Sequence, residues 1–365
     1  PKLVSSSLTW EKIKSTNIGL DVAALNNRLT GSFDYFIRKT EDMMGPGIEL
    51  PAALGTNVPP TNNTDMKTYG WELQIGWRDQ IGDFKYGAKL SLSDSQSKIL
   101  RYGNPTGSLS KYVEGELIGN IYGYTTIGIA KTDEEMQQHL ASLPNGGQSA
   151  LGSQWAAGDI MYADLNGDGK INNGSYTIND MGDMKKIGNS TPRFMTGINL
   201  DAAYKGWDLQ MFWQGVLKRD WWPGDKNMTF WGVTDGEWWS TSFKEHLDYF
   251  RTSENPLGEN LNSYYPRPIF NTKNNKSQTR YLQNAAYMRL KNIQVGYTFP
   301  KVWINKLMLQ NLRIFVSGEN LLTITSLSDT MDPETCGAGY QSTEQANGTV
   351  YPLAKTISFG LSVNF

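Results

Sequence analysis

The sequence predicts an all-β protein, an antiparallel transmembrane β-barrel wall with long loops at one end, and three observations lead to this fold class. Apolar and polar residues alternate with a period of two through many segments. The composition favours twisted strands and tight turns, with 37 Gly, 12 Trp, 18 Tyr and 13 Phe among 365 residues. Short and long connections alternate along the chain, which is typical of outer-membrane barrels.

Composition and charge exclude several other classes. Lys and Arg number 34 against 36 Asp and Glu, and the net charge of −2 removes the electrostatic basis for nucleic-acid binding. The single cysteine, Cys336, excludes an internal disulfide framework, and two histidines, His139 and His246, leave little for histidine-based metal catalysis. The mean hydropathy is −0.48 and no apolar run approaches the length of a membrane-spanning helix. No targeting signal is visible in residues 1–30.

The alternation predicts strands separated by short turns at Leu25–Asn27, Gln80–Asp83 and Lys205–Gly206, with a longer turn at Pro300–Asn311. A slip of phase near Lys291 predicts a β-bulge. The expected strands are 17–24, 28–38, 68–78, 84–93, 192–204, 206–217, 281–299, 312–321 and 354–365. Two loop helices are expected, at Asp133–Leu143, where acidic residues suit a helix N-terminus, and at Glu237–Phe250.

The two faces of these strands differ in a way that indicates lipid on one side and water on the other. One face carries Trp, Tyr, Phe, Leu and Ile, and the other carries Thr, Ser, Gly, Asn and Gln, with few Lys or Glu. A barrel in a membrane needs an apolar outer surface and a polar lumen. An ordinary water-soluble sandwich with one buried face is the alternative.

The number of strands predicts an incomplete barrel. If the short turns are periplasmic, the nine strands begin outside and end at the periplasmic face, whereas single-chain bacterial barrels have an even number. We therefore expect the remaining strands upstream of Pro1, and we expect strands 17–24 and 354–365 to pair outside this chain. A small self-contained pore is the alternative, and it requires a tenth strand from Pro1–Lys14.

The segment Asp164–Ile171 predicts a calcium site. Asp164, Asn166 and Asp168 place oxygen ligands at positions 1, 3 and 5 of an EF-hand-like loop, and the Lys170 carbonyl takes position 7. Ser175 replaces the acid expected at position 12, so Asp180 or Asp183 must fold back, and we take Asp180 as the fifth ligand. A turn without a bound ion is the alternative.

The loop 218–250 contains the candidate substrate-binding residues Trp221, Trp222, Trp231, Trp238 and Trp239. Aromatic rings beside acidic residues suit carbohydrate, whose rings stack while its hydroxyls form hydrogen bonds. Equally, these tryptophans could pack the loop itself or contact a partner protein. The carboxylate pairs Asp164/Asp168 and Asp180/Asp183 could suggest glycoside hydrolysis, but neither histidine lies in a nucleophile setting, and we expect no catalytic residues.

Several stretches resemble SusC-type (SusC/RagA) TonB-dependent outer-membrane transporters of Bacteroidetes, in the order of that family and over nearly the whole chain. They include LTWEK and the following residues (Leu8–Met43), YGWELQIGWRD (Tyr69–Asp79), GDIMYADLNGDGKI (Gly158–Ile171), TPRFMTGINL (Thr191–Leu200), GWDLQMFWQGV (Gly206–Val216), AAYMRLKNIQVGYTFP (Ala285–Pro300), LRIFVSGENLLTIT (Leu312–Thr325) and YPLAKTISFGLSVNF (Tyr351–Phe365).

The resemblance implies that residues 1–365 are the C-terminal part of a 22-stranded barrel, with an extracellular-loop segment at 158–190 that carries the calcium motif. The plug domain and the early strands are expected on a part that this chain lacks. It further implies active import of a nutrient, with an oligosaccharide favoured over a peptide, a SusD-like surface lipoprotein as partner, TonB contacted through the lacking N-terminal part, and outer-membrane lipid around the barrel. The competing function is a calcium-stabilised extracellular β-rich carbohydrate-binding module without transport.

Overall fold

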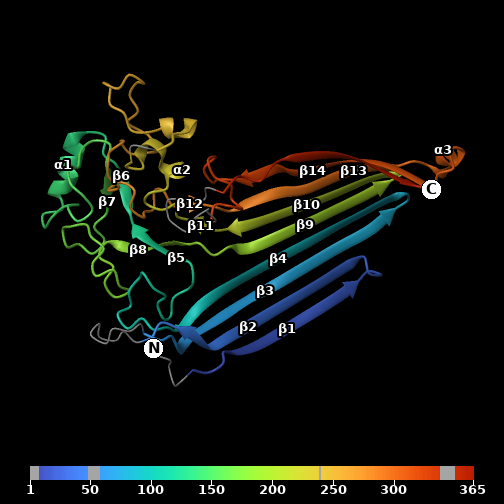
Figure 1. Cartoon of the computed structure of the whole chain (residues 1–365), viewed down its shortest axis with the longest axis horizontal. Coiled ribbons are helices and arrows are strands. Elements are labelled where there is room, and N and C mark those ends of the chain that lie inside the picture. Colours follow the sequence, from blue (N-terminus) through green and yellow to red (C-terminus); the bar gives the residue numbers. More distant parts are fainter. Residues whose placement is uncertain (1–7, 48–57, 238–239, 338–349) are drawn as a thin grey trace.

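The main element of the computed structural model, which describes residues 8–47, 58–237, 240–337 and 350–365, is a single nine-stranded antiparallel sheet (Figure 1). In spatial order its strands are β1 (Lys12–Ala24), β2 (Leu29–Gly45), β3 (Thr61–Ile81), β4 (Phe84–Arg101), β9 (Arg193–Tyr204), β10 (Trp207–Lys218), β13 (Tyr287–Thr298), β14 (Asn311–Thr325) and β15 (Thr356–Asn364). All nine expected strands are thus confirmed, and β1 to β4 extend well beyond the predicted ends.

The remaining elements are short and lie mostly in the long loops at one end of the sheet (Figure 1). Three small two-stranded sheets join β5 (Asn120–Tyr124) to β8 (Met184–Asn189), β6 (Thr126–Ile129) to β7 (Ile160–Tyr162), and β11 (Asp220–Trp221) to β12 (Gln283–Asn284). The helices are α1 (Asp133–Ala141), α2 (Met228–Trp231) and α3 (Lys301–Ile304), with 3₁₀ turns at Gly232–Thr234, Lys244–Leu247 and Asn305–Leu307. None of the helices in the described ranges has both the length and the apolar character needed to cross a membrane.

One of the two predicted loop helices is confirmed. Helix α1 begins after Thr132, whose side chain accepts a hydrogen bond of 3.2 Å from the Glu135 amide and so caps the helix. The helix expected over Glu237–Phe250 is wrong for the described residues 240–250, where only the 3₁₀ turn Lys244–Leu247 forms. Phe250 is buried while Leu247 is exposed, so the spacing of these apolar residues does not define one helical face.

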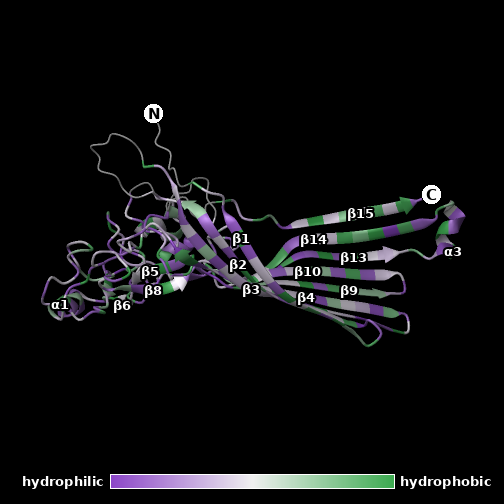
Figure 2. Cartoon of the chain, turned by 90° about the horizontal axis from the view of Figure 1, so that it is seen from below, coloured by the Kyte–Doolittle hydropathy of each residue, from purple (hydrophilic) through white to green (hydrophobic). Residues whose placement is uncertain are grey.

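The strand registers place the alternating apolar residues on one continuous face of the sheet. One row of directly paired residues runs Val22, Gly31, Ile75, Leu90, Ile198 and Trp213, and another runs Leu209, Val295, Val316 and Phe359. Nothing in the described chain covers this face, since Leu20 is 64% and Phe359 81% exposed. Figure 2 shows the banded strands without a second layer on the sheet. The sandwich alternative is therefore wrong.

The predicted β-bulge is confirmed at Lys291. The pairing of β13 with both β10 and β14 shifts between Leu290 and Asn292. Beyond the bulge Leu290 pairs with Trp213 and Leu322, so apolar residues meet apolar residues again. The extra residue thus keeps the apolar face continuous although the sequence changes phase.

The sheet is open. Among the described residues β1 pairs only with β2, and β15 only with β14, and no register joins residues 18–24 to residues 357–365. The small self-contained pore is therefore wrong, and the two exposed edges mark the sheet as a portion of a barrel wall.

Aromatic residues gather where the strands meet the short turns. Phe84 packs on Tyr204, Trp207 on Tyr297, and Phe299 on Trp303, with ring centroids 5.0–6.4 Å apart. Rings at this level are typical of the aromatic girdle at a membrane interface. The sheet thus carries a band of aromatic rings at its short-turn end.

The buried core lies in the loops rather than in the sheet. We call the described parts of the two long loops, residues 102–192 and 219–286, the loop cap. Its core is built mainly from large aromatic and aliphatic residues, among them Met136, Ile160, Tyr162, Ile171, Phe230, Trp231, Tyr265 and Tyr281. The loop cap therefore folds by ordinary hydrophobic burial at one end of the sheet.

Candidate functional site

The face of the sheet opposite the apolar one is lined by small polar residues. Ser32 pairs with Gln74, which in turn pairs with Ser91, and Ser91 pairs with Gly197. A shallow groove of about 450 Å³ lies on this face. Its polar-face lining includes Glu72, Gln74, Ser91, Ser93, Gly197, Phe212 and Gln214. Hydroxyl and amide groups at this density suit the wall of a water-filled passage.

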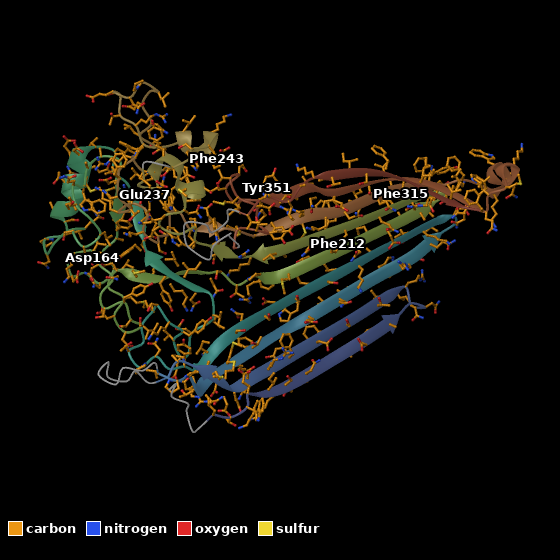
Figure 3. All side chains as sticks on the ribbon, in the orientation of Figure 1. Asp164, Phe212, Glu237, Phe243, Phe315 and Tyr351 are labelled. Atoms are coloured by element: carbon orange, nitrogen blue, oxygen red, sulfur yellow. The ribbon has the colours of Figure 1, made fainter. Side chains whose placement is uncertain are left out.

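Three phenylalanines interrupt the polar face, each beside a glycine of a neighbouring strand. Phe36 pairs with Gly70, Phe212 lies next to Gly197, and the Phe315 ring lies so close to Gly360 that a Cβ there would collide with it. Figure 3 labels Phe212 and Phe315 on the sheet. Because glycine leaves room above the backbone, these rings can lie against the wall while presenting one side to the polar space.

Ion pairs also cross the polar face near the short turns. Arg313 donates hydrogen bonds to both carboxylate oxygens of Asp208, and Arg78 lies 3.2 Å from Asp201. The charges of the wall are thus partly neutralised between strands, and these residues are partly exposed.

A buried ionic cluster joins the two halves of the loop cap. Asp159 is fully buried and accepts hydrogen bonds from Arg267, Asn274 and the Ala156 amide, while the Lys273 ammonium lies 2.8 Å from it. Burial raises the pKa of such a carboxyl, but these donors outweigh it and hold the pKa of Asp159 below its usual value. Sequence reasoning missed this cluster because its members lie more than a hundred residues apart.

The predicted calcium loop forms a tight turn rich in oxygen atoms. Asp164 accepts hydrogen bonds from the amides of Gly167 (2.7 Å) and Gly169 (2.8 Å), and both glycines have positive φ. Asn166 Oδ1 accepts from the Asp168 amide, and Asp168 Oδ1 accepts from the Lys170 amide. Burial opposes the effect, but the two glycine amides hold the pKa of Asp164 below its usual value. Figure 3 labels Asp164 in the loop cap.

Of the two acids that could complete the loop, the structure brings Asp183 to it rather than Asp180. Asp183 accepts hydrogen bonds from the amides of Leu165 and Asn172, and burial together with the nearby Asp164 raises its pKa. Asp180 instead accepts from the amide and hydroxyl of Ser175, which lies outside the segment Asp164–Ile171. Among the described residues no three His, Cys, Asp or Glu side chains lie close enough together to hold a metal, so amide and carbonyl oxygens would have to contribute.

The candidate substrate-binding tryptophans do not form an exposed platform. Trp221 and Trp231 are buried in the core of the loop cap, with Trp231 fully buried, and Trp222 packs against Trp231 at 6.1 Å. Trp238 and Trp239 lie outside the described residues. The described tryptophans therefore pack the loop itself, which was the alternative interpretation of their pattern.

Both histidines are bound into the loop cap. His246 accepts a hydrogen bond from the Phe243 amide at Nδ1, so its Nε2 carries the proton and donates to the Phe230 carbonyl. His139 Nε2 lies 3.1 Å from the Gln148 amide oxygen. Burial lowers the pKa of each ring. These bonds give both ring nitrogens of His246, and Nε2 of His139, structural partners.

The sheet is open and has one apolar and one polar face. Short turns with an aromatic girdle lie at one end and large loops at the other. These features together define part of a transporter-type barrel wall. TonB-dependent receptor P3 of Formosa agariphila is 30% identical over 99% of the chain and 35% of that receptor. TonB-dependent receptor SusC of Bacteroides thetaiotaomicron is 24% identical over the whole chain and 33% of its own length. No family model matches the chain.

The fold agrees with this similarity. The solved structure of the RagAB peptide transporter matches 98% of the chain and 36% of its own chain, with a TM-score of 0.68 and 21% identity. The chain is therefore a homologue, along its whole length, of SusC-type TonB-dependent receptors. It spans about a third of the length of these relatives.

Proposed function

We propose that this chain is part of the barrel subunit of a TonB-dependent importer in the bacterial outer membrane, with an oligosaccharide as its cargo. The observation that carries the proposal is the two-faced open sheet in a chain that matches TonB-dependent receptors from end to end. Lipid contacts the apolar face, and cargo passes along the polar face.

In this proposal the chain is the C-terminal part of the barrel, and the segment 158–190 belongs to the extracellular loops. The remaining strands, the plug domain and the segment that contacts TonB come from outside residues 1–365. A SusD-like lipoprotein docks on the loop cap and delivers the cargo. Such a partner agrees with the position of the loop cap at the end of the sheet opposite the short turns (Figure 1).

Three features of the polar face support a carbohydrate cargo. Its serines and glutamines can exchange hydrogen bonds with sugar hydroxyls, and its phenylalanines can stack on the apolar side of a sugar ring. The ion pairs Arg313–Asp208 and Arg78–Asp201 leave little free charge at the short-turn end for binding a charged cargo. We assign no covalent chemistry to the chain.

We further propose that the loop at Asp164–Lys170 binds a structural Ca²⁺. The donor types suit a hard cation, since Asp164 and Asp183 supply neighbouring carboxylates and Asn166 and the Lys170 carbonyl supply neutral oxygens, while Asp168 has to turn toward them to join the set. The clustering of Asp183 near Asp164 also favours a counter-charge there. Loss of Ca²⁺ affinity in Asp183→Asn, with Asp180→Asn as the matched control, tests this assignment, and equal loss in both variants would contradict it.

The transport proposal is tested in cells that carry the complete transporter. Gln214→Trp adds bulk to the groove on the polar face, whereas Met211→Trp adds the same bulk to the apolar face. We expect the first variant to reduce uptake of labelled oligosaccharides several-fold and the second to leave it near the wild-type rate. Uptake that persists after the proton gradient is abolished would contradict TonB dependence, and uptake of peptides alone would replace the proposed cargo.

A further inference from the structure

A pocket of about 350 Å³ lies in the loop cap just beyond the end of β4. Apart from Ile99 on β4, its lining comes from residues 102–122, and it shares no residue with the groove on the polar face. Small-molecule sites in proteins have volumes of about 300–1,000 Å³ and combine aromatic walls with a few polar groups. The size of this pocket therefore suits a small-molecule ligand.

Three tyrosines and two polar residues form the part of the lining that can recognise a ligand. They are Tyr102, Tyr112, Tyr122, Glu116 and Asn120. Tyr112 is 51% exposed, and its ring meets Tyr102 edge to face, with the ring centroids 5.4 Å apart. This contact fixes the orientation of the Tyr112 ring, while half of the residue remains accessible to a ligand.

The walls of the pocket are held in place by the protein itself. The Asn104 side-chain amide donates to the carbonyls of Ser108 (2.9 Å) and Tyr112 (3.0 Å), and its oxygen accepts from the Ser108 amide. On the opposite side, the Ile99 amide donates to the Glu116 carbonyl at 3.0 Å. Because these segments are ordered before binding, a ligand loses little free energy to the ordering of the protein.

The Glu116 carboxylate is fixed by three donors on one of its two oxygens. Asn120 Nδ2 donates to Oε2 at 2.7 Å, the Tyr122 hydroxyl lies 3.4 Å from the same atom, and the Lys186 ammonium lies 3.0 Å from it. None of these three contacts uses Oε1. Glu116 and Lys186 together carry no net charge, and Lys111, which also lines the pocket, is engaged as well. This balance of charge favours a neutral ligand over an ionic one.

We propose that this pocket binds a neutral sugar ring. Tyr112 stacks on the apolar side of the ring, and Glu116 Oε1 accepts hydrogen bonds from the sugar hydroxyls. A purely aromatic ligand would stack equally well but would offer no hydroxyl to Glu116. The inference rests on the proposed carbohydrate cargo for its ligand class alone, since binding here needs neither TonB nor passage along the polar face.

Amide hydrogen exchange on the complete transporter tests the proposal, in a detergent without a sugar headgroup so that the detergent does not compete. The probes are the methyl glycosides of glucose, galactose, mannose and xylose. We expect at least one of them to slow exchange over residues 102–122. Tyr112→Ala should weaken the apparent affinity about tenfold, whereas Tyr112→Phe, which keeps the ring, should retain it. Phe270→Ala removes another exposed ring of the loop cap and is the matched control.

Ser110→Trp is a second variant, because it adds bulk to the lining at an exposed position and should abolish the protection by sugar. The site is overturned if no glycoside slows exchange over residues 102–122 in the wild type, or if Tyr112→Ala and Ser110→Trp are protected as well as the wild type. Protection by tryptophan amide or glucuronate alone also overturns it.

The pocket and the transport proposal fail in distinguishable ways. Loss of the pocket site leaves the uptake of labelled oligosaccharides to be judged by the Gln214→Trp experiment in cells. Sugar protection of residues 102–122 in a transporter that takes up peptides alone would instead contradict the proposed cargo and support the pocket.

Discussion

The sheet and the loop cap differ in the burial of their apolar side chains. Phe359 on β15 is 81% exposed, whereas Trp231 in the loop cap is fully buried. In the sheet, the backbone ladder joins the strands, and no second layer of the described chain covers the side chains of the apolar face. In the loop cap, side chains exclude water from one another as in a soluble domain. One chain thus combines a sheet with an uncovered apolar face and a loop cap with a buried core. Substitutions in the two regions should therefore destabilise the protein for different reasons.

The largest expected effect lies in the loop cap. Replacing Asp159 with Asn leaves the buried ammonium of Lys273 and the guanidinium of Arg267 without their shared carboxylate. Breaking a buried ion pair in this way costs about 3–5 kcal/mol. Tryptophan fluorescence during thermal unfolding should report a large drop in loop-cap stability. Asp201→Asn, in the exposed pair with Arg78, is the control and should cost less than about 1 kcal/mol. Equal losses would remove the contrast between the regions.

In the sheet, the corresponding substitution introduces a charged side chain on the apolar face. Leu361 lies on the apolar face with Ile357, Phe359 and Val363, and under the proposed lipid contact Leu361→Arg near the bilayer midplane should cost about 2–4 kcal/mol. The measurement is the unfolding free energy of the full transporter in vesicles, or its folded fraction after assembly. Ser358→Arg, on the polar face of the same strand, should be tolerated. Assembly unaffected by Leu361→Arg would argue against lipid contact.

Lowering the pH should have a smaller effect on the stability of the loop cap. Because the folded-state pKa of Asp159 lies below its unfolded value of about 3.9, its contribution to stability is complete above that pH. The contribution is lost as the pH falls through the folded-state pKa. The stability of the loop cap should therefore decline below about pH 4 more steeply in wild type than in Asp159→Asn. Parallel pH profiles of the two proteins would show that this carboxyl does not carry the effect.

The smallest effect is expected at the cap of α1. Thr132→Ala removes the hydroxyl that accepts the Glu135 amide, and such caps contribute about 0.5–2 kcal/mol. Amide hydrogen exchange over the first turn of α1 should accelerate, while exchange in β9 and β10 should not change. Thr132→Ser, which retains the hydroxyl, is the matched control.

The sequence by itself determined the sheet. Period-two alternation depends only on neighbours along the chain, so it located all nine strands, the turn at Leu25–Asn27 and the bulge at Lys291. The same alternation separated the apolar face from the polar face, because each strand carries both faces in its own residues. The oxygen-rich loop at Asp164 could also be predicted from the sequence, because the spacing of its residues is local.

Only the tertiary structure decided the loop cap. The partners of Asp159 lie at Arg267, Lys273 and Asn274, and no local pattern could have paired them. Likewise, aromatic spacing could not tell an exposed platform at Trp231 from a buried core, and two acids three residues apart, Asp180 and Asp183, turned to different partners. In the sheet, each residue's environment depends on whether its position along the strand is odd or even. In the loop cap, the environment depends on which distant segments pack together, and a local sequence pattern does not encode that packing.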